Sequence, residues 1–242
     1  LRHHFLNKKW SWYIILNMRR DLFIKILLLT VASIILVSII FGVNFFYKFY
    51  DDIFRLSSSQ IQETLSTKIS SCKKIIDCKL VVGDILIRRY ITERTWLVNK
   101  LAHPYFTHSA FYLGNDQIVE AVGTEKNPED EIQIATLSKS DWFNNDVENW
   151  VIVRPKNITQ KFNTIKNNLI NIAEDKEYVF GLPQQGYKKF TCADLIFNQL
   201  KENSLVNISN APKIISPDYL FWLATQNPTD FEIVGYGIFI EK

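Results

Sequence analysis

The sequence predicts an α+β domain, with an antiparallel sheet packed on helices, that follows one N-terminal transmembrane helix. Three observations support this: an apolar run at 22–47, short β-rich runs between 79 and 155, and helical patterns between 159 and 226. Strands and helices that are grouped rather than alternating are typical of α+β folds. With 242 residues, 47% of them apolar, the chain is long enough for one sizeable core.

The apolar run at 22–47 is the strongest signal in the first part of the chain. No charged residue occurs from Ile26 to Val43, and about 20 apolar residues suffice for a helix to cross a bilayer. A buried core helix is the alternative, but such a helix should have a polar face, and this run has none. We therefore expect a membrane anchor.

Basic residues gather before the anchor, so the positive-inside rule predicts a cytoplasmic tail at 1–21 and an extracytoplasmic remainder. A cleaved signal peptide is the competing interpretation, but no small-x-small cleavage site precedes Phe45. The only methionine is Met18, so the alternative that residues 1–17 are not translated stays open.

Residues 48–78 link the anchor to the domain. Their apolar positions are spaced for an amphipathic helix, which is either a stalk or a helix packed on the domain: Ile53, Leu56, Ile61, Leu65 and Ile69. Cys72 and Cys78 bracket a short loop and form either a local disulfide or two free thiols. Cys192 is left over in both cases.

Residues 79–242 are predicted to form one domain, whose first half is β-rich. A turn at Gly83–Asp84 introduces the first strand, and the turn at 114–116 joins two strands into a hairpin. Strands are expected after Asp84 up to Tyr90, at 108–114, 117–122, 131–137 and 149–155, and within 231–242.

The net charge is only +3 and no basic stripe with aromatic residues occurs, so nucleic-acid binding is not indicated.

The second half has three helical patterns. Residues 159–174 place four apolar residues on one helical face. A second helix follows Thr191, and a third follows Ser216 with Pro217 at its first position; both Thr and Ser are favoured N-caps. Cys192 thus lies at a helix start, where the helix dipole stabilises a thiolate.

Cys192 is either a buried structural thiol or a nucleophile, and a nucleophile needs a base. His3 and His4 precede the membrane segment and would lie on its other side. His103 or His108 must then be the base, and His108 is preferred because it begins a strand whereas His103 lies in a loop beside Pro104.

Glu120 lies on the strand that pairs with the His108 strand, and alternation can place both side chains on one face. A carboxylate there would hold the imidazole in one tautomer, although a solvated hairpin carboxylate is the alternative. His103, His108 and Cys192 lack the spacing of zinc ligands. We expect neither a metal nor a cofactor.

Five motifs occur in one order: "GDILIRR", "HSAFYLGNDQIVEAVG", "WVIVRPK", "KKFTCADLIFNQL" and "ISPDYL". Together they resemble the YiiX-like, circularly permuted relatives of NlpC-type papain-like peptidases, a group related to lecithin retinol acyltransferase. The resemblance covers about residues 80–225. It implies a permuted papain-like fold, with Cys192 as nucleophile, His108 as base and Glu120 as the third polar group. Ala193 departs from the family, which often has Ser there.

The resemblance also implies a function. The chain would be a membrane-anchored cysteine hydrolase that cleaves an amide bond through an acyl-enzyme, in a cell-wall peptide or in a lipid-linked amide or ester. An acyltransferase acting on lipids and a catalytically inactive, membrane-anchored binding module are the alternatives.

Overall fold

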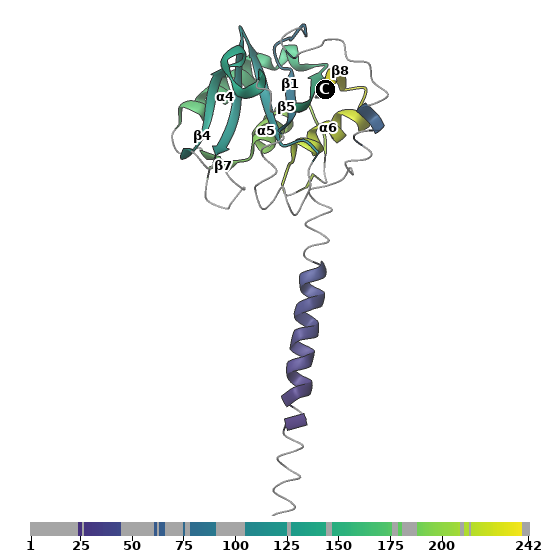
Figure 1. Ribbon diagram of the computed structural model, residues 1–242. Coiled ribbons are helices and arrows are strands. Elements are labelled where there is room, and N and C mark those ends of the chain that lie inside the picture. Colours follow the sequence, from purple (N-terminus) through teal and green to yellow (C-terminus); the bar gives the residue numbers. More distant parts are fainter. Residues whose placement is uncertain are drawn as a thin grey trace, which may run out of the picture. The chain divides into compact units, whose positions relative to one another are not determined.

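The structure is a computed structural model of the chain (Figure 1). It describes residues 24–25, 27–44, 61, 63–65, 75, 78–90, 105–124, 127–143, 147–175, 179–180, 188–208, 211–212 and 214–238. The chain divides into two compact units, residues 1–49 and residues 50–242.

Among the described residues of the first unit, one helix, Leu27–Asn44, is long and apolar enough to cross a membrane. None of it is buried inside the protein; Leu29 and Phe41, for example, are 68% and 72% exposed. Its length, composition and exposed side chains therefore fit a helix that could span a membrane. An N-terminal signal sequence would have the same length and composition.

The second unit is α+β, as predicted, and is built on a six-stranded antiparallel sheet. The strands lie in the order β4-β3-β2-β1-β5-β8, so the chain winds outward from β1 on both sides. Their bounds are Ile85–Tyr90 for β1, His108–Gly114 for β2, Gln117–Thr124 for β3, Asn127–Thr136 for β4, Val147–Pro155 for β5 and Phe231–Ile238 for β8.

The hairpin β2–β3 is confirmed, and its turn explains why it forms here. Gly114, Asn115 and Asp116 have φ values of 90°, 52° and 62°. Glycine, asparagine and aspartate adopt this left-handed region most readily, and a tight hairpin turn requires it. A second, parallel pair, β6 (Val179–Phe180) and β7 (Lys189–Phe190), has only two residues per strand and was not predicted from the sequence.

The three expected helices are present as α4 (Phe162–Glu174), α5 (Cys192–Glu202) and α6 (Pro217–Gln226). The predicted caps are confirmed. The Thr191 hydroxyl accepts the amide of Asp194, the Ser216 hydroxyl accepts the amide of Tyr219, and Pro217 is the first residue of α6. Figure 1 shows the helices beside the sheet.

Each face of the sheet has its own core. Odd-numbered residues of the central strands, such as Ile85, Phe111 and Val151, pack with the helices α4, α5 and α6. Even-numbered residues, such as Leu86 and Ala110, pack with Leu137 and Trp142 from the two 3-10 helices η3 (Leu137–Lys139) and η4 (Asp141–Phe143). Side-chain parity thus decides which core a strand residue joins.

In the linking segment, Ile61 and Leu65 are buried in the helix-side core of the second unit. These residues therefore pack on the domain rather than project from it as a stalk. Ile53, Leu56, Ile69 and Cys72 lie outside the described residues. Cys78 is disulfide-bonded and Cys192 is free, which favours the bridge over the two free thiols.

Candidate active site

Cys192 is the first residue of α5, and its surroundings hold that helix start in place. Thr191 and Asp194 form a reciprocal capping box, in which each side chain bonds the other's backbone amide. Cys192 itself is only 6% exposed. The first amides of a helix have no acceptor within the helix, so those of Cys192 and Ala193 point toward the same end of α5 as the thiol.

His108 is the first residue of β2, and Glu120 lies across the hairpin on β3. The register pairs Phe111 with Val119, so Glu120 lies beside Ala110, two residues along from His108 and on the same face. This diagonal distance is within reach of long side chains. The Nε2 atom of His108 is 2.7 Å from the Oε2 atom of Glu120.

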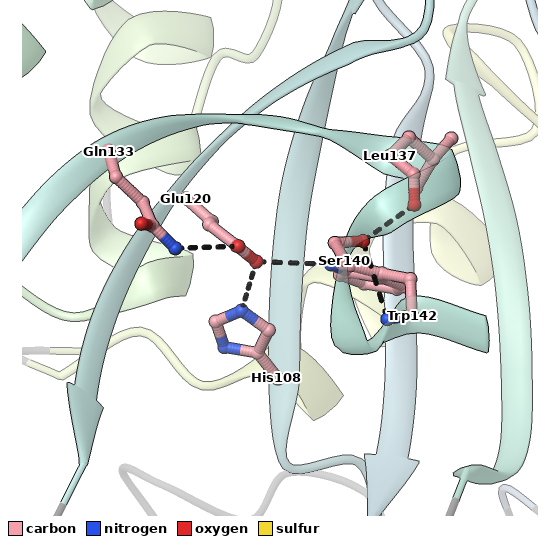
Figure 2. Close-up of polar contacts among 6 residues, drawn as sticks. All are labelled: His108, Glu120, Gln133, Leu137, Ser140 and Trp142. Carbon is pink, nitrogen blue, oxygen red and sulfur yellow. Dashed lines mark hydrogen bonds and ion pairs between the residues drawn. The ribbon is translucent and has the colours of Figure 1, made fainter. Parts of the chain in front are cut away.

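The Glu120 carboxylate is held from three sides (Figure 2). Besides His108, the indole Nε1 of Trp142 donates to Oε2 over 3.0 Å, and the amide Nε2 of Gln133 donates to Oε1 over 3.1 Å. Gln133 comes from the neighbouring position on β4. Glu120 is 4% exposed, and a buried carboxylate with this many donors remains ionised.

The Cys192 thiol lies close enough to His108 for the two groups to interact electrostatically. Because Nε2 of the ring faces Glu120, Nδ1 is the nitrogen left for the thiol. The acceptor Glu120 keeps the proton of the neutral ring on Nε2, so Nδ1 presents its lone pair to the thiol proton. Cys192 and His108 lie 84 residues apart in sequence (192 − 108), and α5 packs against β2 and β3.

The charge state of His108 follows from its neighbours. Burial disfavours the imidazolium and lowers the pKa of His108, but the Cys192 thiolate and hydrogen bonds to Cys192 and Glu120 reverse this and raise the pKa to about 10. The contacts of His108 with Cys192 and Glu120 therefore favour the protonated ring, and in that form His108 can donate a proton to a leaving group.

The pKa of Glu120 is shifted in the opposite direction from that of His108. Burial raises the pKa of its carboxyl, but the hydrogen bond and charge of His108, the charge of Arg88 and the indole of Trp142 lower it to about 2. Arg88 is the residue of β1 that pairs with His108. Its guanidinium carbon lies 4.4 Å from the centre of the Trp142 ring.

The structure brings the predicted Cys192, His108 and Glu120 together, and their catalytic roles stay a prediction. Asp84, in the turn before β1, is a structural group: its carboxylate accepts from Arg154 and from the amide of Val81. His103 lies outside the described residues.

Three further residues belong to this site but were not predicted as site residues from the sequence: Arg88, Gln133 and Trp142. Gln133 was within reach of pattern reasoning, because a third strand in register with the hairpin places a residue beside Glu120. Trp142 comes from a 3-10 helix of three residues, which has no periodicity to detect.

Within the described part of the chain, no group of three or more His, Cys, Asp or Glu side chains is arranged to hold a metal ion. Comparison of the sequence with protein-family models and with curated proteins finds no match.

Replacing Trp142 with Phe is expected to destabilise the protein by removing a donor to the buried Glu120 carboxylate. Trp150→Phe is the matched control: it lies in the same core, is as buried, and its indole N–H has no partner among the described residues. Both changes remove the same volume, so Trp142→Phe should cost about 1.5–3 kcal/mol more in urea unfolding. Equal losses for the two variants would contradict the role of this hydrogen bond.

Proposed function

We propose that this chain is a membrane-anchored cysteine hydrolase that cleaves an amide bond, in a cell-wall peptide or a lipid-linked amide or ester. The observation that carries the proposal is the ordered pairing of one thiol, one imidazole and one carboxylate. Nε2 of His108 is tied to Glu120, its other nitrogen is left for Cys192, and Cys192 begins a capped helix. Nucleophile, base and orienting group are the parts that acyl transfer through a covalent intermediate requires.

The proposed reaction has two stages. The Cys192 thiolate attacks the carbonyl carbon of the amide, a C–S bond forms, and the carbonyl electron pair moves to oxygen. The amides at the start of α5 are oriented to stabilise that oxyanion. When the carbonyl re-forms, the C–N bond breaks and the His108 imidazolium gives its proton to the leaving amine. His108 then takes a proton from water, whose oxygen displaces the thiolate and releases a carboxylic acid.

The finer fold assignment belongs to the same proposal. The motif order, with the His108 strand before the Cys192 helix, resembles the YiiX-like permuted relatives of papain-like peptidases. An antiparallel sheet whose strands pack against the nucleophile helix supports that resemblance.

An extracytoplasmic position of the domain is also proposed. Basic residues precede the apolar helix, which favours a cytoplasmic N-terminus. The disulfide at Cys78 supports the same side, because disulfides persist in oxidising compartments. A hydrolase placed there reaches both cell-wall peptides and membrane lipids.

Alkylation of Cys192 by iodoacetamide tests the proposal on the full chain in detergent, with the modified peptide quantified by mass spectrometry. We expect fast labelling at pH 7 that falls by about 10²-fold or more in His108→Ala, since positioned proton transfer typically contributes 10²–10⁴-fold. His108→Ala also removes the cation that stabilises the thiolate.

A second measurement separates the enzyme from a binding module. Incubation with an activated ester such as p-nitrophenyl acetate should add one acetyl group to Cys192, and hydrolysis should then remove it. Labelling of Cys192 that is unaffected by His108→Ala, together with no acylation, would identify the chain as the inactive module. An acetyl group that water does not remove from Cys192, but that an added alcohol or amine does remove, would identify the acyltransferase.

A further inference from the structure

The start of α6 holds the backbone that leads into β2. Asp218, the second residue of α6, is 2% exposed. Its Oδ1 accepts the amide of Phe106 over 2.7 Å and its Oδ2 accepts the amide of Tyr105 over 2.9 Å. These bonds join segments more than 100 residues apart in sequence, and the donating amides lie two and three residues before His108.

A second carboxylate, Asp194, ties the same region of α6 to α5. Its Oδ1 accepts the amide of Ile215 over 3.1 Å, while its Oδ2 accepts from the Thr191 hydroxyl over 2.6 Å. The Thr191 hydroxyl also lies 3.2 Å from the carbonyl oxygen of Ile215. Asp194 is two residues after Cys192 and 4% exposed, so the backbone before α6 is fixed to the helix turn that carries the thiol.

These bonds make one continuous connection from the nucleophile to its base. It runs from Cys192 through Asp194 to Ile215, along the backbone into Asp218, and across to Phe106 and His108. Its noncovalent links are hydrogen bonds between a buried carboxylate and a backbone amide, and such charge-assisted bonds are about twice as strong as neutral ones.

We propose that Asp218 is a positioning residue of the active site, which sets the separation of His108 from Cys192 by anchoring the segment before β2 to α6. The inference rests on the proposed function, because it assigns Asp218 a role in the pairing of those two groups. Asp218 acts through His108 and does not touch the substrate.

The charges around Asp218 fit an acceptor that is ionised at mildly alkaline pH. Burial raises the pKa of Asp218 to about 7, whereas the amides of Phe106 and Tyr105 and the charge of Arg89 on β1 act to lower it. The Arg89 guanidinium lies 4.9 Å from the centre of the Tyr105 ring, and the Tyr105 hydroxyl accepts from Asn149. At pH 8 the Asp218 carboxylate is therefore charged and can accept hydrogen bonds from the backbone amides of both Tyr105 and Phe106.

The test is a double-mutant cycle read as the rate of Cys192 alkylation by iodoacetamide at pH 8, on the full chain in detergent. Asp218→Asn keeps the size of the side chain but turns one oxygen into a donor, which cannot accept the second amide. We expect the rate to fall about 10- to 100-fold, because displacements near 1 Å have such effects. In a His108→Ala background, the same substitution should change the rate less than about twofold.

Asp84→Asn is the matched control, because Asp84 is a fully buried aspartate that accepts a backbone amide at the other end of β1. It should lower the melting temperature and leave the alkylation rate within about twofold. If Asp218→Asn does not fold, Asp218→Glu replaces it, which keeps the charge but moves the carboxylate by one methylene.

An equal effect of Asp218→Asn with and without His108 would overturn the positioning role, since a general loss of structure acts in both backgrounds. So would an unchanged rate in Asp218→Asn. If His108→Ala alone left alkylation unchanged, the proposed function would fail, and the positioning role with it. The two failures are thus told apart by the His108→Ala arm.

Discussion

Glu120→Gln is expected to lower the rate of Cys192 acylation by roughly 10⁴-fold, the loss seen when the carboxylate of a catalytic triad becomes an amide. The carboxylate can only accept, so it keeps the ring proton of His108 on Nε2. The amide of Gln can donate to Nε2 instead, and the proton then moves to Nδ1. A thiol facing a protonated Nδ1 in a neutral ring has no base.

Gln133→Leu is the control for this substitution. It removes the hydrogen bond to Oε1 of Glu120 and leaves the bond between Oε2 and His108 intact. Its acylation rate should stay within about tenfold of the wild type, because the tautomer is unchanged. A Glu120→Gln variant as active as Gln133→Leu would remove Glu120 from the mechanism.

The Glu120→Gln variant also has a pH signature in its stability. The pKa of Glu120 is lowered from 4.5 to about 2 in the folded protein. A group with a depressed folded pKa contributes stability above its unfolded pKa and loses it as the pH falls through the folded value. The stability difference between wild type and Glu120→Gln should therefore shrink steadily from pH 5 toward pH 2 in urea unfolding.

Arg154→Met is expected to cost about 3–5 kcal/mol of unfolding free energy, the usual effect of removing one partner from a buried ion pair. Two nitrogens of Arg154, Nε and a terminal one, donate to the Asp84 carboxylate over 2.7 and 2.9 Å. Asp84 is fully buried and Arg154 is 23% exposed on its side chain. Without Arg154, the Asp84 carboxylate would retain, among the described residues, the hydrogen bond from the amide of Val81.

The surface pair Lys188–Asp175 provides the comparison. Its two side chains are 44% and 37% exposed and lie 3.0 Å apart, and exposed pairs contribute about 0–1 kcal/mol. Lys188→Met should therefore unfold at nearly the urea concentration of the wild type. A small effect of Arg154→Met, similar to that of Lys188→Met, would show that Asp84 finds other partners or becomes neutral.

Much of the architecture was predictable because it depends on local signals. The turn at 114–116 specified the hairpin β2–β3, and with it the face that His108 and Glu120 share. Thr191 and Ser216 marked the starts of α5 and α6. Each of these features is decided within a few residues of sequence, where side-chain chemistry and backbone preference agree.

The rest of the site depends on contacts between distant segments, which local patterns do not encode. Trp142 reaches Glu120 from a short 3-10 helix, and Asp218 reaches Phe106 from α6. An aspartate in the first turn of a helix is common for electrostatic reasons alone. Nothing in "SPDYL" indicates that Asp218 accepts hydrogen bonds from backbone amides in the segment that precedes β2.

The division of the site between a hairpin and a later helix has a consequence for the newly made chain. The hairpin carrying His108 and Glu120 is local, whereas Cys192 must dock from a helix 84 residues onward (192 − 108). Such distant contacts form late, because closing a long loop costs entropy first. Until that docking, Cys192 has no imidazole beside it. If Cys192 is the proposed nucleophile, the chain therefore gains a base for its thiol only on complete folding, and an unfolded chain would not acylate itself or its neighbours.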